Sequence, residues 1–260
     1  MNLALRGISH HLGEMSDSSF THDLHKGLYF DYIMANPPFN LKNWGQEQLQ
    51  EDPRWQYGLP PAGNANFAWI EHMIYHLAPG GKIGLVLANG ALSTQTGGEG
   101  EIRKRIIEAD LVEGIVAMPT QLFYSVTIPV TLWFISRGKK QKGKTLFIDA
   151  RNMGHMVDRK HRDLSEYDIE RLASTFEKFQ KGKLQDEKGF CAVVETADIA
   201  KQDYILTPGR YVGIEDTVQD DEPFEQKMTR LTGELSQMFA KSHDLEKQIK
   251  KNLEDLGFKM

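Results

Sequence analysis

The residues best suited to chemistry in this sequence stand at positions 36–39, where Asn-Pro-Pro-Phe follows a short apolar run. Proline fixes its own φ, so Pro37 and Pro38 lock the backbone directly after Asn36. A locked backbone can aim the side-chain oxygen of Asn36 and a neighbouring main-chain carbonyl at one point. Two such acceptors suit an exocyclic amine, which offers two N–H donors. Phe39 adds a flat apolar face on which an aromatic ring can stack.

This arrangement fits methylation of an amino group on a nucleobase. The lone pair of adenine N6 is delocalised into the ring, so this nitrogen is a poor nucleophile. Two acceptors that pull on its hydrogens favour a more tetrahedral nitrogen, most strongly as positive charge develops in the transition state. A base within a duplex must first be flipped out, which costs a few kcal/mol. Stacking on Phe39 would offset part of that cost.

Alternating strands and helices are expected to position this tetrapeptide. The apolar residues 29–35 predict a buried strand that ends at Asn36. Further strands are expected over residues 82–92, 111–119, 128–137 and 144–151, and helices over residues 1–12, 66–78 and 99–110. This order is typical of a parallel α/β sheet, with one antiparallel pair allowed between the third and fourth strands. Ligands of such sheets bind beyond the carboxyl ends of the strands, where the tetrapeptide stands.

The chain changes character after residue 151. Ser165 and Asp168 have the spacing of a helix capping box. The last 37 residues predict one long helix with a heptad-like series of apolar residues: Phe224, Met228, Leu231, Leu235, Met238, Leu245, Ile249 and Leu256. Ser242 and Asn252 interrupt this series, which favours register control or pairing with another chain over a helix that covers this chain's own core.

Composition narrows the class of protein. The 260 residues suffice for one large domain, or for one domain with an appendage. The net charge of −5 neither indicates nor excludes a nucleic-acid partner, because a local basic patch is enough. The single cysteine, Cys191, excludes an internal disulfide and a cysteine-based zinc site, and the nine histidines show no metal-ligand spacing. Without an apolar run of about 20 residues or a signal-peptide pattern, the expected compartment is the cytoplasm.

The tetrapeptide and its surroundings resemble a known family. Residues 36–39 are similar to motif IV of the N6-adenine and N4-cytosine DNA methyltransferases. The blocks "FDYIMANPPFN", "RWQYGLPPAGNANFAWIEHMIYHLAPGGKIGLVLANGALS", "GEGEIRKRIIEADLVEGIVAMPTQLFYSVTIPVTLWFISR" and "DYILTPGRYVG" resemble the modification subunit of type I restriction-modification systems, over nearly all of the chain. This resemblance implies a Rossmann-like methyltransferase fold that uses S-adenosylmethionine to methylate adenine N6 in DNA. Its partners would be a specificity subunit, which the C-terminal helix would contact, and a restriction subunit.

The resemblance also implies roles for individual residues. The catalytic residues would be Asn36, Pro37, Pro38 and Phe39; the cofactor would contact Asp17, Ser18 and Asn36; and DNA or the target base would contact Phe39, Asn64, Asn66 and Phe123. Simpler interpretations stay open for several of them. The two asparagines before the helix at 66 could serve only as a cap, and Phe123 could belong to the core. The basic stretches 103–108 and 137–144 could contact phosphates or could be ordinary solvated surface.

One part of the family pattern is missing. Such enzymes bind S-adenosylmethionine on a Gly-rich turn of the type Asp-Pro-x-x-Gly-x-Gly, followed by a strand that ends in a ribose-binding acid, both upstream of motif IV. Nothing before Asn36 has this pattern, and the Gly-rich residues 89–100 follow a later strand, where a plain loop is favoured over a cofactor loop. We therefore expect an N-terminally truncated or split methyltransferase whose cofactor half another chain supplies. The alternative is an inactive remnant that acts as a binding or assembly module.

The expected organisation has three parts. Residues 1–150 would form the target-base part of the catalytic domain, residues 151–220 a helical or irregular extension, and residues 221–260 a helix for subunit contact. In the family's fold, the strand that ends at Asn36 lies in the middle of the sheet. Without the cofactor half, residues 29–35 are expected to form an exposed edge that invites self-association, and the isolated chain is expected to bind S-adenosylmethionine poorly.

Overall fold

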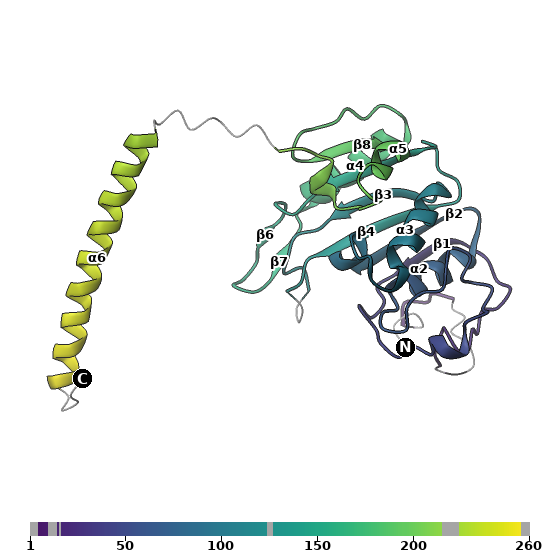
Figure 1. Cartoon of the computed structure of the whole chain (residues 1–260), viewed down its shortest axis with the longest axis horizontal. Coiled ribbons are helices and arrows are strands. Elements are labelled where there is room, and N and C mark those ends of the chain that lie inside the picture. Colours follow the sequence, from purple (N-terminus) through teal and green to yellow (C-terminus); the bar gives the residue numbers. More distant parts are fainter. Residues whose placement is uncertain (1–4, 10–14, 16, 124–126, 215–223, 256–260) are drawn as a thin grey trace. The chain divides into compact units, whose positions relative to one another are not determined.

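A computed structural model describes residues 5–9, 15, 17–123, 127–214 and 224–255 of the chain (Figure 1). The chain divides into two compact units, Met1–Glu215 and Asp216–Met260. The first unit contains a mixed β-sheet with helices on both faces, and the described part of the second unit is one long helix. The expected α/β sheet with flanking helices and a long C-terminal helix is therefore confirmed.

The main sheet of the described residues has six strands in the order β1-β2-β4-β3-β5-β8. Their bounds are β1 Phe30–Ala35, β2 Leu77–Ala88, β3 Val112–Ala117, β4 Val130–Ser136, β5 Lys144–Asp149 and β8 Cys191–Glu195. The pairs β1/β2 and β3/β5 are parallel, whereas β4 runs antiparallel to both β2 and β3. The antiparallel β3/β4 pair matches the expectation. The sheet is less parallel than expected because β4 returns between β2 and β3, and because β8 pairs antiparallel with β5.

Contrary to expectation, the strand before the tetrapeptide is not buried. Tyr32 is 77% exposed and Met34 is 89% exposed on β1, which is the outermost strand of the described sheet. On the other face of the same strand, Ile33 and Ala35 pack against the core. A continuous apolar run indicates a strand with two covered faces. The run here has a partner strand on one side only, as the expected exposed edge requires.

Helices cover the two faces of the sheet separately. On one face lie α2 (Asn66–Tyr75), α3 (Glu99–Glu108) and α5 (Thr196–Ala200), which share a core with inward-facing strand residues such as Ile115, Trp133 and Phe147. On the other face, α4 (Glu166–Gln180) packs against Val116, Leu132 and Ile148. This assignment follows from the strand period of two, because neighbouring residues of one strand point to opposite faces.

The remaining elements are short. They are η1 (Gln46–Gln48), η2 (Asn89–Leu92), η3 (Thr96–Gly98), η4 (Pro208–Arg210), β6 (His155–Met156) and β7 (Arg162–Asp163). The predicted capping box begins α4 as expected, because the Ser165 hydroxyl accepts from the Asp168 N–H at 3.2 Å and the Asp168 carboxylate accepts from the Ser165 N–H at 2.9 Å. The extension after residue 151 also contributes β8, a strand that the sequence pattern did not indicate. The helix expected over residues 1–12 falls largely outside the described residues.

The second unit contains α6 (Phe224–Asp255). Its apolar stripe is exposed along the described part of the helix, at Met228, Leu231, Leu235, Met238, Phe239, Leu245 and Ile249. Among the described residues, no helix is both long enough and apolar enough to cross a membrane. The same residues contain no group of three or more side chains that could hold a metal ion.

Candidate functional site

The tetrapeptide lies at the carboxyl edge of the sheet, together with the ends of neighbouring strands. Ala35 pairs with Leu85 in the parallel β1/β2 ladder, so both strands end on the same side. Because β3 runs in the same direction as β2, the loop after Ala117 leaves from this edge too. That loop carries Phe123, and both Phe123 and Phe39 are partly buried against one apolar cluster, on the face that α4 covers.

We call residues 36–39 the elbow. Pro37 is buried and Phe39 is half-buried, whereas Asn36 and Pro38 are exposed. The elbow is therefore anchored through its first proline and its aromatic ring. The Asn36 side chain is left accessible to a ligand at the strand end.

An asparagine network holds the residue that follows the elbow. The side-chain oxygen of Asn66 accepts from the Asn40 backbone N–H at 3.0 Å, and the Asn66 amide donates to the Asn40 side-chain oxygen at 3.0 Å. Asn64 reaches the same Asn40 oxygen at 3.4 Å and accepts from the Asn66 backbone N–H at 3.0 Å. Asn66 is the first residue of α2, so the Asn64 side chain also satisfies an N–H at the start of this helix. The structure thus joins Asn64 and Asn66 to the elbow segment, and Asn64 to the helix start as well.

Asp17 and Ser18 begin a short turn that leads toward β1. The Asp17 carboxylate accepts from the Ser18 N–H at 2.7 Å and contacts the His22 ring at 2.7 Å. These hydrogen bonds, first from Ser18 and then from His22, hold the pKa of Asp17 below its ordinary value. Ser18 in turn accepts from the Phe20 N–H at 3.3 Å. The two residues therefore brace their own turn, and the Asp17 carboxylate is already engaged.

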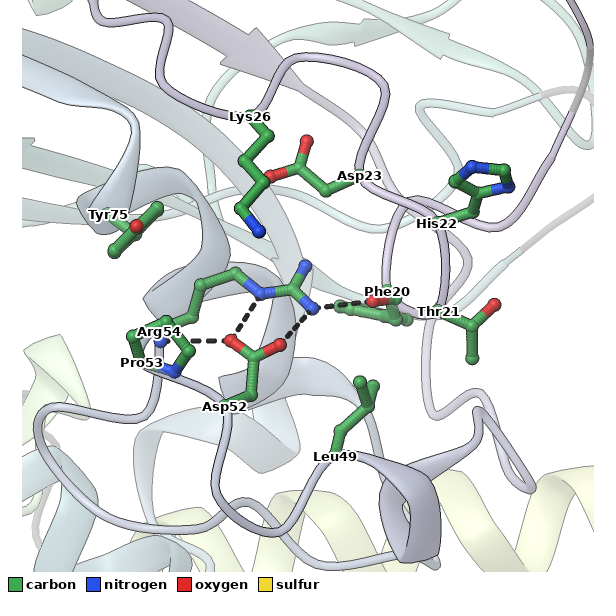
Figure 2. A pocket seen from close by; sticks show the side chains of 10 residues that line it. All are labelled: Phe20, Thr21, His22, Asp23, Lys26, Leu49, Asp52, Pro53, Arg54 and Tyr75. Atoms are coloured by element: carbon green, nitrogen blue, oxygen red, sulfur yellow. Dashed lines mark hydrogen bonds and ion pairs between the residues drawn. The ribbon is translucent and has the colours of Figure 1, made fainter.

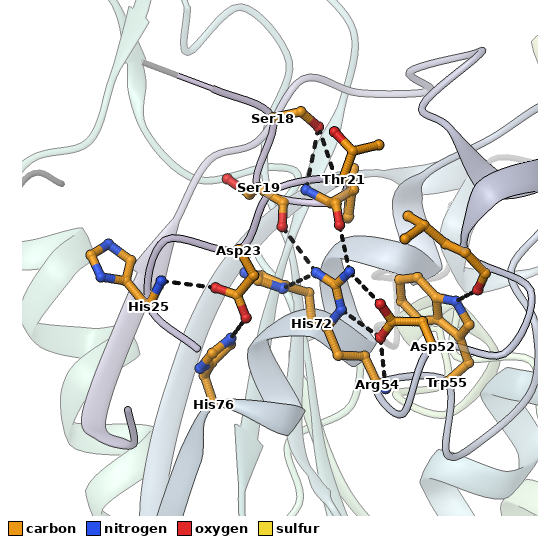
Figure 3. A network of polar contacts seen from close by, with 12 residues as sticks. Ser18, Ser19, Thr21, Asp23, His25, Asp52, Arg54, Trp55, His72 and His76 are labelled. Atoms are coloured by element: carbon orange, nitrogen blue, oxygen red, sulfur yellow. Dashed lines mark hydrogen bonds and ion pairs between the residues drawn. The ribbon is translucent and has the colours of Figure 1, made fainter. Parts of the chain in front are cut away.

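A buried arginine ties this turn to the rest of the unit. Arg54 is 4% exposed, and its guanidinium lies between the turn, the 49–57 loop and α2 (Figure 3). It pairs with both oxygens of Asp52 at 2.7 Å, and donates to the carbonyl oxygens of Ser19 and Phe20. Its remaining N–H meets Nδ1 of His72 at 3.0 Å. All five donors of the guanidinium are thus in use, so Arg54 acts as a structural clamp.

His72 of α2 and His76, which directly follows this helix, complete the network. His72 receives its hydrogen bond from Arg54 at an unprotonated nitrogen, and burial, followed by the nearby His76 and Arg54, lowers the pKa of His72 to about 4. His76 lies between the carbonyl oxygen of Leu28 at 2.9 Å and the carboxylate of Asp23 at 3.0 Å. One helix therefore holds both the turn that leads to β1 and, through Asn66, the segment after the elbow.

A pocket of about 270 Å³ opens beside this clamp (Figure 2). Its walls are formed by Phe20, Thr21, His22, Asp23, Lys26, Leu49, Asp52, Pro53, Arg54 and Tyr75. The elbow residues do not line it. Because Arg54 has no free donor in this wall, the pocket lacks a buried cation available for a ligand.

The Gly-rich residues 89–100 connect β2 to α3 and include the first turn of that helix. Glu99 is 2% exposed and accepts from the Thr94 hydroxyl at 2.9 Å, and burial raises the pKa of Glu99. Arg103 is fully buried and donates to the carbonyl oxygens of Thr94 and Tyr204. A buried carboxylate at this position argues against a phosphate loop. Within the basic stretch 103–108, Arg103 is therefore buried in the core of this unit and is not a surface residue.

Glu71 is a buried acid on the same helix as the asparagine and histidine contacts. It is fully buried, and one of its oxygens accepts from the Tyr57 backbone N–H at 2.9 Å. The other oxygen has no hydrogen-bond partner. Burial raises the pKa of Glu71 to about 8, although the Tyr57 N–H and the charge of Arg105 oppose this shift.

Sequence reasoning missed four of these residues. Asn40 could have been noticed because asparagine follows the elbow directly and tolerates a left-handed backbone, and its φ is 53°. The spacing of Asp52 and Arg54 indicates a local ion pair, yet nothing near them in the sequence points to the carbonyl oxygens of residues 19 and 20. For Glu71, the only signal is an acid among the apolar positions of a buried helix.

Comparisons with known proteins show the family to which the chain belongs. The sequence model of the N-6 DNA methylase family matches residues 1–220. The chain is 52% identical to the type I restriction enzyme HindI methylase subunit of Haemophilus influenzae, over 99% of this chain and 58% of that protein. It is 45% identical to the MjaIX methylase subunit of Methanocaldococcus jannaschii, over 99% of this chain and 48% of that protein. The chain thus spans about half the length of these relatives.

Solved structures show the same fold. The methyltransferase subunit of a type I restriction-modification system from Streptococcus thermophilus superposes with a TM-score of 0.70 at 24% identity, covering 82% of this chain and 45% of that one. The M protein of the type I restriction enzyme EcoKI superposes with a TM-score of 0.60 at 16% identity, covering 95% of this chain and 56% of that one. With the family match over most of its length, the chain belongs to the N-6 DNA methylase family.

Proposed function

We propose that this chain is the target-base part of an adenine-N6 DNA methyltransferase, the modification subunit of a type I restriction-modification system. The observation that supports this most is the elbow, an Asn-Pro-Pro-Phe at the carboxyl end of β1 with an anchored backbone and an accessible asparagine. In this proposal, residues 1–150 carry the target-base site, residues 151–220 extend the sheet, and residues 221–260 contact another subunit.

The chain's own residues would bind and orient the target adenine. The side-chain oxygen of Asn36, with a main-chain carbonyl that Pro37 and Pro38 hold in place, would accept the two hydrogens of the N6 amine. These contacts strengthen as the nitrogen becomes tetrahedral and positive, so they stabilise the transition state more than the ground state. Phe39 would stack on the flipped base. Phe123, which packs on the same apolar cluster as Phe39, would line the pocket.

Asn64 and Asn66 belong to the same region in this proposal. Both reach Asn40, the residue directly after the elbow. Asn64 is half-buried and retains access to solvent, whereas Asn66 is 1% exposed. Of the two, Asn64 is therefore better placed to contact DNA.

S-adenosylmethionine would supply an electrophilic methyl group on its sulfonium. The described residues fit this cofactor only in part. Asp17 and Ser18, in the turn that Arg54 clamps, and Asn36, at the end of β1, offer polar groups, but both oxygens of Asp17 are engaged by Ser18 and His22. The described residues contain no Gly-rich turn after a strand on the outer side of β1. We propose that the rest of the cofactor site comes from a segment that pairs with the free edge of β1.

The partners follow from the same proposal. The exposed edge of β1 would receive the part of the enzyme that holds the cofactor, because its N–H and C=O groups and apolar side chains are open to another strand. The apolar stripe of α6 would pack against helices of the specificity subunit. The assembled subunits would bind DNA and would work with a restriction subunit.

The test is methyl transfer to DNA by an assembly that contains this chain. We would combine it with the cofactor-binding part and the specificity subunit of the same system, and measure transfer of labelled methyl groups to adenine. Removal of one aimed acceptor costs about 3 kcal/mol, or roughly 100-fold in rate. Asn36→Ala should therefore lose at least that factor, while Gln185→Ala, which changes an exposed amide in a pocket lined by Lys144 at the start of β5, should keep full activity.

The outcomes separate the alternatives. Full activity in Asn36→Ala would contradict the role of the elbow. Stable assembly without methylation by the wild-type chain would favour an inactive assembly module. Methylation of cytosine instead of adenine would correct the substrate while keeping the amine-binding chemistry.

A further inference from the structure

Asn66 is buried at the start of α2 and makes a two-point contact with Asn40. Asn66 is 1% exposed, and its side-chain oxygen and nitrogen each lie 3.0 Å from a complementary group of Asn40. Asn40 is exposed and has a left-handed φ of 53°. The neighbouring backbone adds a third contact, because the Ala65 N–H donates to the carbonyl oxygen of Leu41 at 3.0 Å. The segment after the elbow is thus fixed to the first turn of a buried helix.

The contact between Asn66 and Asn40 restricts the backbone conformation of the elbow at its C-terminal end. A peptide unit is planar and trans, so a fixed Asn40 N–H also fixes the direction of the Phe39 carbonyl. Within the elbow, Pro37 and Pro38 fix their own φ angles. Few backbone torsions are then left free between Asn36 and Asn40.

We propose that Asn66 is a positioning residue of the methyl-transfer site, which acts through Asn40 to hold Asn36 and Phe39 in the orientation that receives the target base. The proposal rests on the proposed function, in which the elbow binds the amine. In this proposal the buried side chain of Asn66 affects the rate of methyl transfer although it does not touch the base.

The proposal predicts a separation of rate from stability. In Asn66→Ala, water can replace the lost partner of the exposed Asn40, so the urea concentration at the midpoint of unfolding should fall only slightly. A displacement of about 1 Å in a catalytic group can lower the rate roughly 100-fold. We therefore expect kcat of the assembled enzyme to fall by about that factor, with KM for DNA and for S-adenosylmethionine changing less than about threefold.

A matched control lies on the same helix. Ile74 is 1% exposed in the core and has no contact with the elbow segment in the hydrogen-bond network above. Ile74→Val removes one buried methyl group, and the urea midpoint of unfolding should fall by about as much as in Asn66→Ala. It should leave kcat within about twofold of wild type. If Ile74→Val lowers kcat as much as Asn66→Ala, the effect is one of stability and the proposal fails.

A second readout does not depend on activity. In the chain itself, amide hydrogen exchange of Asn40 reports whether its N–H is held, because exchange requires this hydrogen bond to open. We expect exchange at this amide to rise about tenfold or more in Asn66→Ala and to stay unchanged in Ile74→Val. Unchanged exchange in Asn66→Ala would overturn the clamp. An assembly without any methylation would instead overturn the proposed function, and with it the catalytic consequence.

A double-mutant cycle tests whether the two asparagines act as one unit. Asn40→Gly keeps the backbone N–H and permits the left-handed φ, but removes the side-chain oxygen. Because residues in one network couple, the double variant Asn40→Gly with Asn66→Ala should lose no more rate than Asn66→Ala alone. Losses that multiply would assign the two residues independent roles and would contradict the proposal. The cycle also remains informative if Asn66→Ala folds poorly, because Asn40→Gly alone should lower kcat without raising either KM.

Discussion

Replacing Glu71 by glutamine should remove a pH-dependent loss of stability. Glu71 is fully buried on α2, with one oxygen bonded to the Tyr57 N–H and the other without a partner. Its charged form is therefore poorly solvated, and burial raises its pKa from 4.5 to about 8. Glutamine has nearly the same shape as the protonated acid and can still accept from Tyr57. It cannot ionise.

The sign and the size of this pH effect follow from the linkage between protonation and folding. Because the folded pKa is raised, the stability that Glu71 contributes is complete below pH 4.5 and is lost as the pH rises through about 8. One pKa unit corresponds to about 1.4 kcal/mol, so the shift corresponds to a total loss on the order of 5 kcal/mol. Glu71→Gln should thus be about as stable as wild type at pH 5, and several kcal/mol more stable at pH 9.

Urea unfolding of wild type and Glu71→Gln across this pH range measures the effect. The difference between the two proteins isolates Glu71, because groups such as His72 titrate in both and cancel. Glu101→Gln is the matched control, since Glu101 lies on the surface of α3 with its side chain 50% exposed. A stability difference that does not change between pH 5 and pH 9 would refute the assignment of a buried, protonated Glu71.

Three further predictions concern the clamp, the edge and the cofactor. Arg54→Lys offers three donors in place of five, and each buried group left without a partner costs about 1–3 kcal/mol. Unfolding in urea should therefore show a loss of about 2–5 kcal/mol, and a loss below 1 kcal/mol would contradict the clamp. Met34→Lys places a charge on the exposed edge and should reduce self-association in light scattering at several concentrations, unless the wild-type chain is already monodisperse. Calorimetry of the isolated chain should detect only weak binding of S-adenosylmethionine, and a micromolar Kd would show that the residues before Asn36 suffice for a site.

Much of the fold could be predicted because its signals are local. The apolar runs and helical periods placed β2 to β5, α2, α3 and α6, since each depends on side chains a few residues apart. The capping box of α4 was predicted from Ser165 and Asp168 alone, because both partners lie within one turn. The elbow was likewise evident, because two consecutive prolines restrict the backbone whatever surrounds them.

The order of the strands in the sheet could not be predicted from local sequence patterns. The apolar run of β1 is by itself compatible with a central strand, and its free side was expected only because the cofactor half of the family pattern is missing. The sheet confirms that one side of β1 has no neighbour among the described strands. The insertion of β4 between β2 and β3 depends on which ladders can form together. β8 was missed because a five-residue strand carries little pattern of its own.

The contacts that hold the candidate site in place depend on tertiary structure alone. Asn40 and Asn66 are 26 residues apart, and Arg54 lies 35 residues from Ser19. No local preference brings such partners together. They meet because packing of α2 against the sheet places its first turn beside the elbow and its later turns beside the segment that leads into β1. The sequence determines which groups can do the chemistry at the elbow, and the packing of one buried helix determines where those groups point.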